Sequence, residues 1–353
     1  MKNTKNTNVR NLPNNAKKIL WVRPDSIGDA VLASSMLPFI KKGFKEAEIH
    51  VVCQAHLYDF YAACPHVTEI IGFDQQRLLD FPHYREELVA LLGAKNYDLS
   101  LNSVYSPTSI TDFFNSNNGA RIKVDYKTAV KDSPRDQLEL KRHRNFVTAL
   151  DCQIAKDLNP LIWIPQQTET FAENFFENNS LKASNTIVLA AGVQFSPRLY
   201  DHYCEALESL CKEESLTVIV MGIERDRPVI NNNLRNFTGK TVDLVGKTSV
   251  LEMAAIIKRS RILVGADAAA AHIACAVKTP NAIVLGGGHY RRFFPYSPLT
   301  YCAVLHLDCF GCDWVCKFDR PYCIQEVLPR TLEKAVRGAL ASSDKRIYFQ
   351  ESL

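Results

Sequence analysis

The segment best suited to chemistry is Val264-Gly-Ala-Asp267-Ala-Ala-Ala-Ala-His272-Ile-Ala-Cys-Ala276. It predicts a buried strand that ends at Asp267 and a helix of small residues that begins immediately afterwards. Such a turn points free backbone N–H groups and the positive end of a helix dipole outward, which suits a phosphate or diphosphate. Asp267 is costly to bury unless a partner stabilises its charge. His272 either borders the same opening or is a satisfied core histidine.

A second turn of this kind lies near the N-terminus, where Arg23-Pro-Asp-Ser-Ile-Gly28-Asp29 follows an apolar stretch. Asp29 is expected in the first turn of a helix, where the dipole lowers the cost of its charge. It is therefore either a helix-terminal charge or a general base that faces a cleft between two domains. Arg23 and Gly28 are expected to support this loop.

Three further loops are expected at the carboxyl ends of strands, where ligands bind in open parallel sheets. They span residues 190–198, 222–227 and 286–292. The last begins with three glycines, whose lack of side chains lets a ligand approach the backbone. A P-loop lysine motif is absent, and the first turn has one glycine where the dinucleotide fingerprint needs three. A kinase and a dehydrogenase are therefore disfavoured.

A cluster of cysteines near the C-terminus has the spacing C-x2-C-x3-C-x6-C, formed by Cys309, Cys312, Cys316 and Cys323. Four thiolates this close in sequence can close a tetrahedral zinc or iron site. Such a site would be structural, because four protein ligands leave no open position. A reduced cluster of loop thiols and a disulfide are the alternatives.

Length and composition indicate a globular protein of two domains, since 353 residues are long for a single core. The apolar fraction is 46% and the charged fraction 23%, which excludes a disordered chain. A net charge of +4 is too small to hold a nucleic acid by itself. The Asn-rich start has no apolar signal region, so we expect a cytoplasmic protein with reduced cysteines.

The alternation of strands and helices predicts the α/β class with parallel sheets. The expected strands are 17–23, 48–54, 69–74, 97–104 and 120–126 in the first half, and 185–192, 216–222, 241–245, 261–267 and 281–286 in the second. We expect a disordered tail over 1–16, a first domain over 17–165, a polar linker with at most one short helix over 166–184, and a second domain over 185–353 that includes the Cys-rich segment 309–323.

These loops together resemble glycosyltransferase family 9, the ADP-heptose heptosyltransferases of lipopolysaccharide assembly. The first signature of that family, Arg followed by Ile-Gly-Asp and Leu-Pro, is matched by Arg23, Ile27-Gly28-Asp29 and Leu37-Pro38. The second, an Asp followed by Ser/Thr-Gly and a His, is matched by Asp267 and His272, with Ala268 and Ala269 in place of the Ser/Thr-Gly pair. The resemblance covers most of residues 17–340.

The resemblance implies a GT-B fold, in which two Rossmann-like domains with parallel sheets face each other across a cleft. It implies an acceptor-binding first domain and a donor-binding second domain. The implied reaction is the inverting, metal-independent transfer of a heptose or a related sugar from a nucleotide donor, ADP-heptose, to a lipopolysaccharide-type or other surface-glycan acceptor. Asp29 becomes the general base, and no cofactor is required apart from a structural zinc or iron at the cysteines.

The donor-site positions implied by the resemblance are Arg198, Asp267, Ala268, Ala269, His272, Gly287 and Gly288, with Gly192 supporting the loop before Arg198. The acceptor is a glycan or glycolipid, which the enzyme would meet at the inner face of the membrane. Candidate membrane contacts are Lys41, Lys42, Lys45 and the run Lys141–Arg144, which equally suit a solvated surface. No nucleic-acid partner is expected.

Two alternatives stay open. The pair Ala268-Ala269 loses a hydroxyl and the room that a glycine leaves for a phosphate, which favours a non-catalytic, metal-binding scaffold on a decayed transferase fold. An NAD-dependent sugar-nucleotide enzyme is the other, and the missing glycine fingerprint disfavours it.

Overall fold

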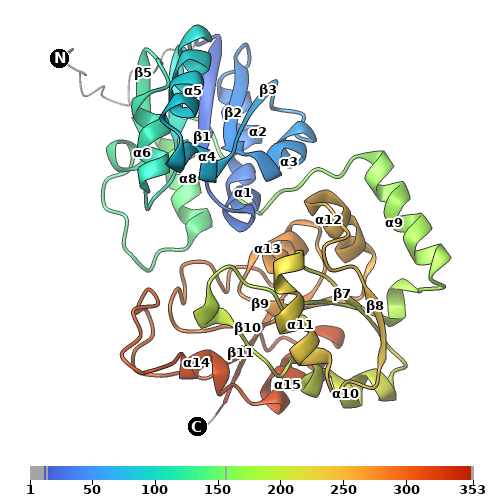
Figure 1. The fold of residues 1–353 in the computed structure, drawn as a ribbon. Helices are drawn as coiled ribbons and strands as arrows, with labels where there is room; N and C mark the ends of the chain where they lie inside the picture. Colours follow the sequence, from blue (N-terminus) through green and yellow to red (C-terminus); the bar gives the residue numbers. More distant parts are fainter. Residues whose placement is uncertain (1–11, 13–14, 156, 351–353) are drawn as a thin grey trace. The chain divides into compact units, whose positions relative to one another are not determined.

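The computed structural model describes residues 12, 15–155 and 157–350, so most of the predicted tail over 1–16 lies outside the described residues. The chain divides into two compact units. The first comprises Met1–Pro134 and Glu139–Trp163, and the second Arg135–Leu138 and Ile164–Leu353. In Figure 1 the first unit runs from blue to green and the second from green to red.

The first unit is built on a five-stranded parallel sheet of order β3-β2-β1-β4-β5. Its strands are β1 (Lys18–Arg23), β2 (Glu48–Gln54), β3 (Glu69–Phe73), β4 (Leu99–Asn102) and β5 (Ile122–Asp125). Its helices are α1 (Ile27–Ala33), α2 (Leu37–Gly43), α3 (Tyr58–Ala62), α4 (Gln75–Asp80), α5 (Pro82–Ala94), α6 (Ser109–Ser116), α7 (Tyr126–Ala129) and α8 (Glu139–Ala149). The central strand β1 is buried from its second residue to its last, as a strand covered on both faces requires.

Helix α1, which contains Asp29, ends after 7 residues. A short 3-10 turn over Ser34–Met36 separates α1 from α2, and Pro38 lies in the first turn of α2. Proline lacks the N–H that would continue the α-helical ladder, so the second helix starts afresh at the Leu37-Pro38 pair.

The second unit is built on a seven-stranded parallel sheet of order β12-β11-β10-β9-β6-β7-β8. Its strands are β6 (Thr186–Ala190), β7 (Thr217–Val220), β8 (Lys240–Asp243), β9 (Ile262–Ala266), β10 (Asn281–Val284), β11 (Thr300–Val304) and β12 (Ile347–Phe349). Its helices are α9 (Gln166–Asn178), α10 (Tyr203–Glu213), α11 (Arg227–Leu234), α12 (Val250–Arg259), α13 (Ala269–Ala276), α14 (Tyr322–Gln325) and α15 (Pro329–Leu340). Strands β11 and β12 were not predicted, and β12, with 3 residues, is too short to show alternation.

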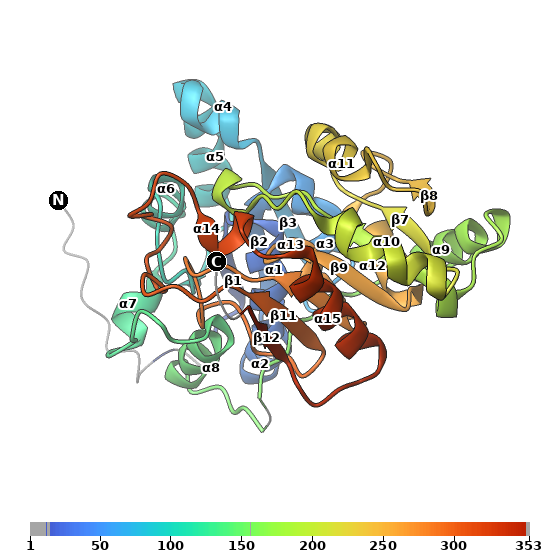
Figure 2. The same ribbon diagram turned by 90° about the horizontal axis from the view of Figure 1, so that it is seen from below.

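The main core of the second unit lies between the sheet and helices α10 and α15. Leu207 and Leu210 of α10 join Leu332 and Val336 of α15 in one cluster with the strand residues. Figure 2 shows α15 beside β11 and β12, where it covers the end of the sheet that the sequence analysis did not predict.

The region predicted as a linker contains a 13-residue helix, α9, where at most a short one was expected. Its Ala172 and Phe176 are buried, while its acidic side chains reach α12. Lys258 of α12 donates to Glu169 at 2.5 Å, and Arg259 pairs with Glu173. The polar composition that suggested a linker therefore belongs to the outer face of a packed helix.

The helices of the described residues include none that is both long and apolar enough to cross a membrane.

Candidate active site

The first candidate site lies at the carboxyl end of β1. The chain proceeds from β1 toward β2 on one side and later returns to β4 on the other, so β1 and β4 flank a topological switch point of the sheet. Arg23, the last residue of β1, bridges this point, because its Nη1 donates to Ser103 Oγ beyond β4 at 2.9 Å. Only 2% of Arg23 is exposed.

The buried guanidinium of Arg23 organises the loop that follows β1. It forms an ion pair with Asp25 and donates from Nη2 to the backbone carbonyl of Asp29 at 3.4 Å. Burial raises the pKa of Asp25 above the usual carboxyl range, and the Arg23 guanidinium opposes that shift. The Gln54 amide donates to the carbonyls of Pro24 and Asp25, at 2.9 and 3.2 Å. The loop is thus held from three directions.

Asp29 lies in the first turn of α1 and is half-buried. Its Oδ2 accepts a hydrogen bond of 2.8 Å from the Ser26 hydroxyl. Gly28, beside it, is buried. The structure thus places the predicted base, Arg23 and Gly28 in one ordered loop, and it adds Asp25, Ser26 and Ser103, which the sequence analysis did not select.

Helix α8 packs on α1 and adds buried polar side chains close to this loop. Burial lowers the pKa of His143 to about 3, so its imidazole is neutral at physiological pH. Arg142 is completely buried, donates to Glu139 at 2.8 Å and stacks on Tyr105. The predicted basic surface run Lys141–Arg144 is therefore wrong in its centre, because Arg142 and His143 belong to the interior.

The second candidate site lies at the corresponding point of the second sheet. Strands β6 and β9 are neighbours, and the chain leaves them toward opposite edges, so they flank a second switch point. Arg198, in the loop after β6, donates from Nη1 to the backbone carbonyl of Asp267 after β9 at 2.7 Å. Its Nε is buried and has no hydrogen-bond partner within the described part of the chain. Arg198 therefore offers a spare donor at this edge.

Asp267 and His272 lie at the start of α13, as predicted. Asp267 is 3% exposed and His272 is 4% exposed. The His272 ring stacks on Phe294 with 4.5 Å between centroids, and its Nδ1 lies 3.0 Å from the Tyr296 hydroxyl. Burial, assisted by the charge of Arg198, lowers the pKa of His272 to about 3. The structure therefore brings Arg198, Asp267 and His272 together, with the histidine embedded in an aromatic stack.

The pair Ala268-Ala269 forms the entry to α13. Ala268 is the N-cap residue with extended backbone, and no side chain caps the helix. Helix N-termini without side-chain caps leave backbone N–H groups for solvent or a ligand. Both alanines are half-buried, so the backbone donors that the turn predicts are present while the hydroxyl is lost.

The glycine loop after β10 is covered by the Cys-rich segment. A Cβ on Gly287 would overlap the Phe310 ring, and one on Gly288 would overlap Trp314. The backbone closes the contact, since the N–H of Gly311 donates to the Gly287 carbonyl at 2.8 Å. These glycines thus make room for aromatic side chains of the same chain, and a role in donor binding stays a prediction.

Further groups beside Arg198 were missed by the sequence analysis. Trp314 lies edge-on to Phe195 and to His289, at centroid distances of 6.1 and 6.0 Å. Burial, with the charges of Arg292 and Arg198, lowers the pKa of His289 to about 4. The histidines of this edge are therefore neutral, and its charged side chains include two arginines.

The four cysteines do not fit the predicted metal site. Within the described residues, no three His, Cys, Asp or Glu side chains come together closely enough to hold a metal ion. All four thiols are free. Cys323 is buried on α14 and accepts from the Gly287 N–H at 3.4 Å, whereas Cys316 is exposed and lies 3.5 Å from the Arg320 carbonyl. The four thiols nevertheless lie near one another, because the charges of Cys309, Cys312 and Cys316 add to the burial that raises the pKa of Cys323. The structure thus shows reduced thiols in one region of the chain, and a structural zinc or iron there stays a prediction.

Gly192 precedes Arg198 in the loop after β6. A Cβ on Gly192 would overlap the Asp226 carboxylate, which accepts the Ile223 N–H at 3.0 Å. A side chain there would push the β6 loop away from the β7 loop, so Gly192 supports the position of Arg198 from behind.

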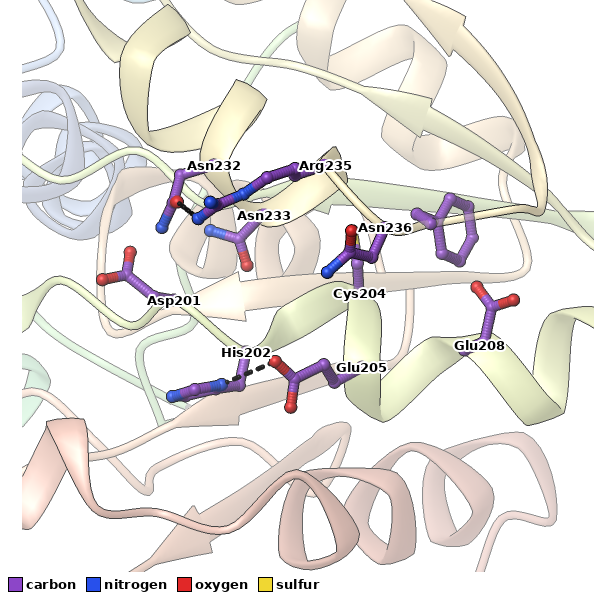
Figure 3. A pocket seen from close by; sticks show the side chains of 10 residues that line it. Asp201, His202, Cys204, Glu205, Glu208, Asn232, Asn233, Arg235 and Asn236 are labelled. Atoms are coloured by element: carbon purple, nitrogen blue, oxygen red, sulfur yellow. Dashed lines mark hydrogen bonds and ion pairs between the residues drawn. The ribbon is translucent and has the colours of Figure 1, made fainter.

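A pocket of about 200 Å³ lies between α10 and the end of α11, apart from the predicted site residues (Figure 3). Its ionisable side chains are mostly carboxylates, which disfavour an anionic ligand. Two of its polar side chains already have partners in the pocket wall. His202 pairs with Glu205 at 2.9 Å, and Arg235 donates to Asn232 at 2.8 Å. We do not assign the donor to it. It is lined by Asp201, His202, Cys204, Glu205, Glu208, Asn232, Asn233, Arg235, Asn236 and Phe237.

Residues 114–317, more than half of the chain, match glycosyltransferase family 9 (heptosyltransferase). The chain belongs to glycosyltransferase family 9. Lipopolysaccharide heptosyltransferase 2 of Salmonella typhimurium is 24% identical over 305 residues, which cover 81% of this chain and 86% of that protein.

Solved structures show the same fold. The glycosyltransferase family 9 protein of Veillonella parvula superposes with a TM-score of 0.76 at 15% identity, covering 93% of this chain and 98% of that one. An E. coli heptosyltransferase, WaaC, with ADP-2-deoxy-2-fluoro heptose superposes with a TM-score of 0.61 at 14% identity, covering 92% and 99%. The fold is therefore GT-B, and the protein is a glycosyltransferase rather than an NAD-dependent enzyme.

Proposed function

We propose that this family 9 glycosyltransferase moves a heptose from ADP-heptose to a lipopolysaccharide-type acceptor, with inversion at the anomeric carbon. One observation carries the proposal: the two switch points present complementary chemistry. The loop after β1 offers the half-buried carboxylate of Asp29, and the loop after β6 offers a guanidinium, Arg198, with an unused buried donor.

Asp29 is proposed as the general base. As the acceptor hydroxyl oxygen attacks the anomeric carbon, its proton passes to the carboxylate of Asp29. The bond from the anomeric carbon to the diphosphate oxygen breaks on the opposite side, and ADP leaves with that electron pair. A single displacement of this kind inverts the anomeric centre.

Arg198 is proposed to meet the charge that develops on the departing diphosphate. A preorganised cation is effective here because it needs no rearrangement as the charge forms. The N-terminal backbone N–H groups of α13 add donors at the same edge. With these groups in place the reaction needs no metal, and we propose that it proceeds without one.

The donor is proposed from the relatives as well as from this edge. One solved relative holds an ADP-heptose analogue, and the curated relative is a lipopolysaccharide heptosyltransferase. The change to Ala268-Ala269 removes one hydroxyl while it leaves the backbone donors. We therefore keep the nucleotide diphosphate and expect the sugar contacts to differ in detail.

The acceptor is proposed to be a glycolipid met at the inner face of the membrane. Lys42, in the last turn of α2, and Lys45, just after it, are exposed and suit an anionic surface. Lys41 is engaged, because it donates to the carbonyls of Lys45 and Ala47 at 2.9 and 2.8 Å.

The test is a transfer assay with ADP-heptose and lipopolysaccharide extracted from a strain that lacks this gene. Mass spectrometry should show the acceptor gaining one heptose, and NMR should show an anomeric configuration opposite to that of the donor. Activity should survive EDTA. A thermal shift with ADP but no transfer would change the acceptor. No shift with ADP, UDP or GDP would contradict the proposal and favour a decayed scaffold.

A further inference from the structure

We infer that Ser26 is a positioning residue for Asp29: its hydroxyl holds one carboxylate oxygen of the base so that the other is presented to the acceptor. The inference rests on the proposed function, because it takes Asp29 to be the base. It goes beyond that function in assigning a role to a residue that does not touch substrate.

The first observation is that Ser26 stands at a helix cap without capping. It has the backbone conformation of an N-cap residue, with φ −80° and ψ 171°, and its carbonyl accepts the first helical hydrogen bond from Ala30 at 2.9 Å. A serine at this position usually accepts a hydrogen bond from a backbone N–H two or three residues later. The Ser26 side chain accepts none, so the usual stabilising contact is given up.

The second observation is where the hydroxyl goes instead. It donates to Oδ2 of Asp29 at 2.8 Å, a hydrogen bond to a carboxylate three residues along the same turn. Within the described residues no hydrogen bond is made to Oδ1 of Asp29. The carboxylate is thus held at one oxygen and available at the other, which is the arrangement a general base needs.

The third observation is that the turn itself is fixed at both ends. Arg23 donates to the Asp29 carbonyl and pairs with Asp25, immediately before Ser26. Because the buried Arg23 guanidinium holds the backbone on both sides of Ser26, the distance between Ser26 and Asp29 is fixed by the fold of the turn. Rigid support of this kind keeps catalytic groups within a fraction of an ångström of the productive geometry.

The consequence concerns the reaction more than the fold. A donor to one carboxylate oxygen fixes the orientation of the whole group. Removing the donor should therefore lower kcat, while the KM for ADP-heptose and the melting temperature stay close to those of the unsubstituted enzyme.

The experiment compares Ser26→Ala, Ser26→Gly and Ser26→Thr in steady-state assays with ADP-heptose and the lipopolysaccharide of the deletion strain. We expect kcat to fall about 10-fold in the first two, in line with the loss of a hydrogen bond to a charged group. Threonine keeps the hydroxyl and should restore most of the rate. Glycine is a good N-cap residue, so its defect cannot come from helix capping. Ser34→Ala is the matched control, since Ser34 donates to the Ala30 carbonyl on the same helix.

The outcomes separate this inference from the proposed function. If Asp29→Asn abolishes transfer while Ser26→Ala keeps kcat within two-fold, the positioning role is overturned and the base stands. If Asp29→Asn is active, the base itself is wrong. A Ser26→Ala variant with a lower melting temperature, and a rate that threonine at this position does not restore, would show a structural residue only.

Discussion

The loop after β1, and the loops after β6 and β9 together, each bring an aspartate beside an arginine at a switch point, yet the two sites use the pair in opposite ways. In the first, Arg23 is consumed by Asp25, Ser103 and the Asp29 backbone, and the Asp29 carboxylate is left half-buried with one hydrogen-bonded oxygen. In the second, Arg198 donates from Nη1 to the backbone carbonyl of Asp267, and its buried Nε has no hydrogen-bond partner within the described residues. The first switch point thus presents a carboxylate and the second a guanidinium.

This difference shows that the type of residue at the end of a strand does not by itself determine its role. Both aspartates follow a buried strand, and both lie at the start of a helix. What separates them is the partner of the neighbouring guanidinium and the degree of burial. Substitutions that remove one partner at a time test whether the two sites have separate roles.

The largest effect is expected from Asp29→Asn, which keeps the shape of the side chain and removes the proposed base. Transfer should fall about 1,000-fold or more, since general bases contribute roughly 100- to 10,000-fold. ADP binding should be unchanged, because the donor is assigned to the other domain. Steady-state kinetics and calorimetric titration with ADP measure the two quantities. A variant that loses ADP binding as well would contradict the separation of roles.

The next effect is expected from Arg198→Ala. Loss of the cation should weaken ADP binding about 10- to 100-fold and lower kcat as well, because the charge on the leaving group is no longer met. Arg198→Lys should recover part of both. Arg337→Ala, which removes an arginine paired with Glu213 and Glu333 on the surface, is the control. Unchanged ADP affinity in Arg198→Ala would remove Arg198 from the donor site.

The stability of the folded protein should depend on pH through two buried histidines, one in each unit. His272 in the second unit and His143 in the first have a pKa of about 3, whereas an unfolded histidine has its ordinary value near 6.5. The unfolded chain therefore binds protons first, and stability present above pH 6.5 is lost as the pH falls toward 3. At pH 5 each histidine should cost roughly 2 kcal/mol.

Melting curves from pH 7.5 to 4.5 test this dependence. His272→Phe keeps the aromatic stack and removes the titrating group, so its melting temperature should fall less steeply with acid than that of the unsubstituted enzyme. His83→Gln changes a histidine whose side chain is 83% exposed and should leave the slope unaltered. Equal slopes in all three would mean that His272 does not stay neutral in the folded state.

The sequence predicted the parts of this picture that depend on local pattern. Alternating strands and helices gave the α/β class, and the strand-to-helix turns located Asp29 and Asp267. It could not predict that the Ser26 hydroxyl donates to the Asp29 carboxylate instead of capping the helix. A serine three positions before Asp29 suits either contact, so the residue types do not distinguish them. The sequence allowed only a short helix where α9 has 13 residues, because the polar outer face of α9 resembles a linker. It also did not predict the burial of Arg142 inside a charged run.

Contacts between distant segments were the least predictable part. The glycines after β10 were expected to admit a ligand, and nothing in their own neighbourhood indicates that Phe310 and Trp314 return to cover them. The cysteine spacing suggested a metal, yet no three of these side chains within the described residues come close enough to hold one, and Cys323 is buried while Cys316 is exposed. Both outcomes depend on how one segment packs over another, which spacing along the chain does not determine.

The smallest effect is expected at Gly287, in the glycine loop that follows β10. An alanine there must displace the Phe310 ring in a buried site, which should cost about 1–2 kcal/mol of stability. Gly93→Ala is the matched control: its Cβ would meet nothing within 4 Å on helix α5, so it should stabilise by roughly 0.5–1 kcal/mol. Melting temperatures with and without ADP measure both.

The pair of measurements decides what the glycine is for. If its purpose is to admit Phe310, Gly287→Ala should lower the melting temperature equally with and without ADP, and the ADP affinity should be unchanged. If the glycine admits a ligand, the affinity should fall while the unliganded protein keeps its stability. The first result would show that the Cys-rich segment supports the glycine loop after β10. The loop after β1 is supported instead by the ion pair of Arg23 with Asp25.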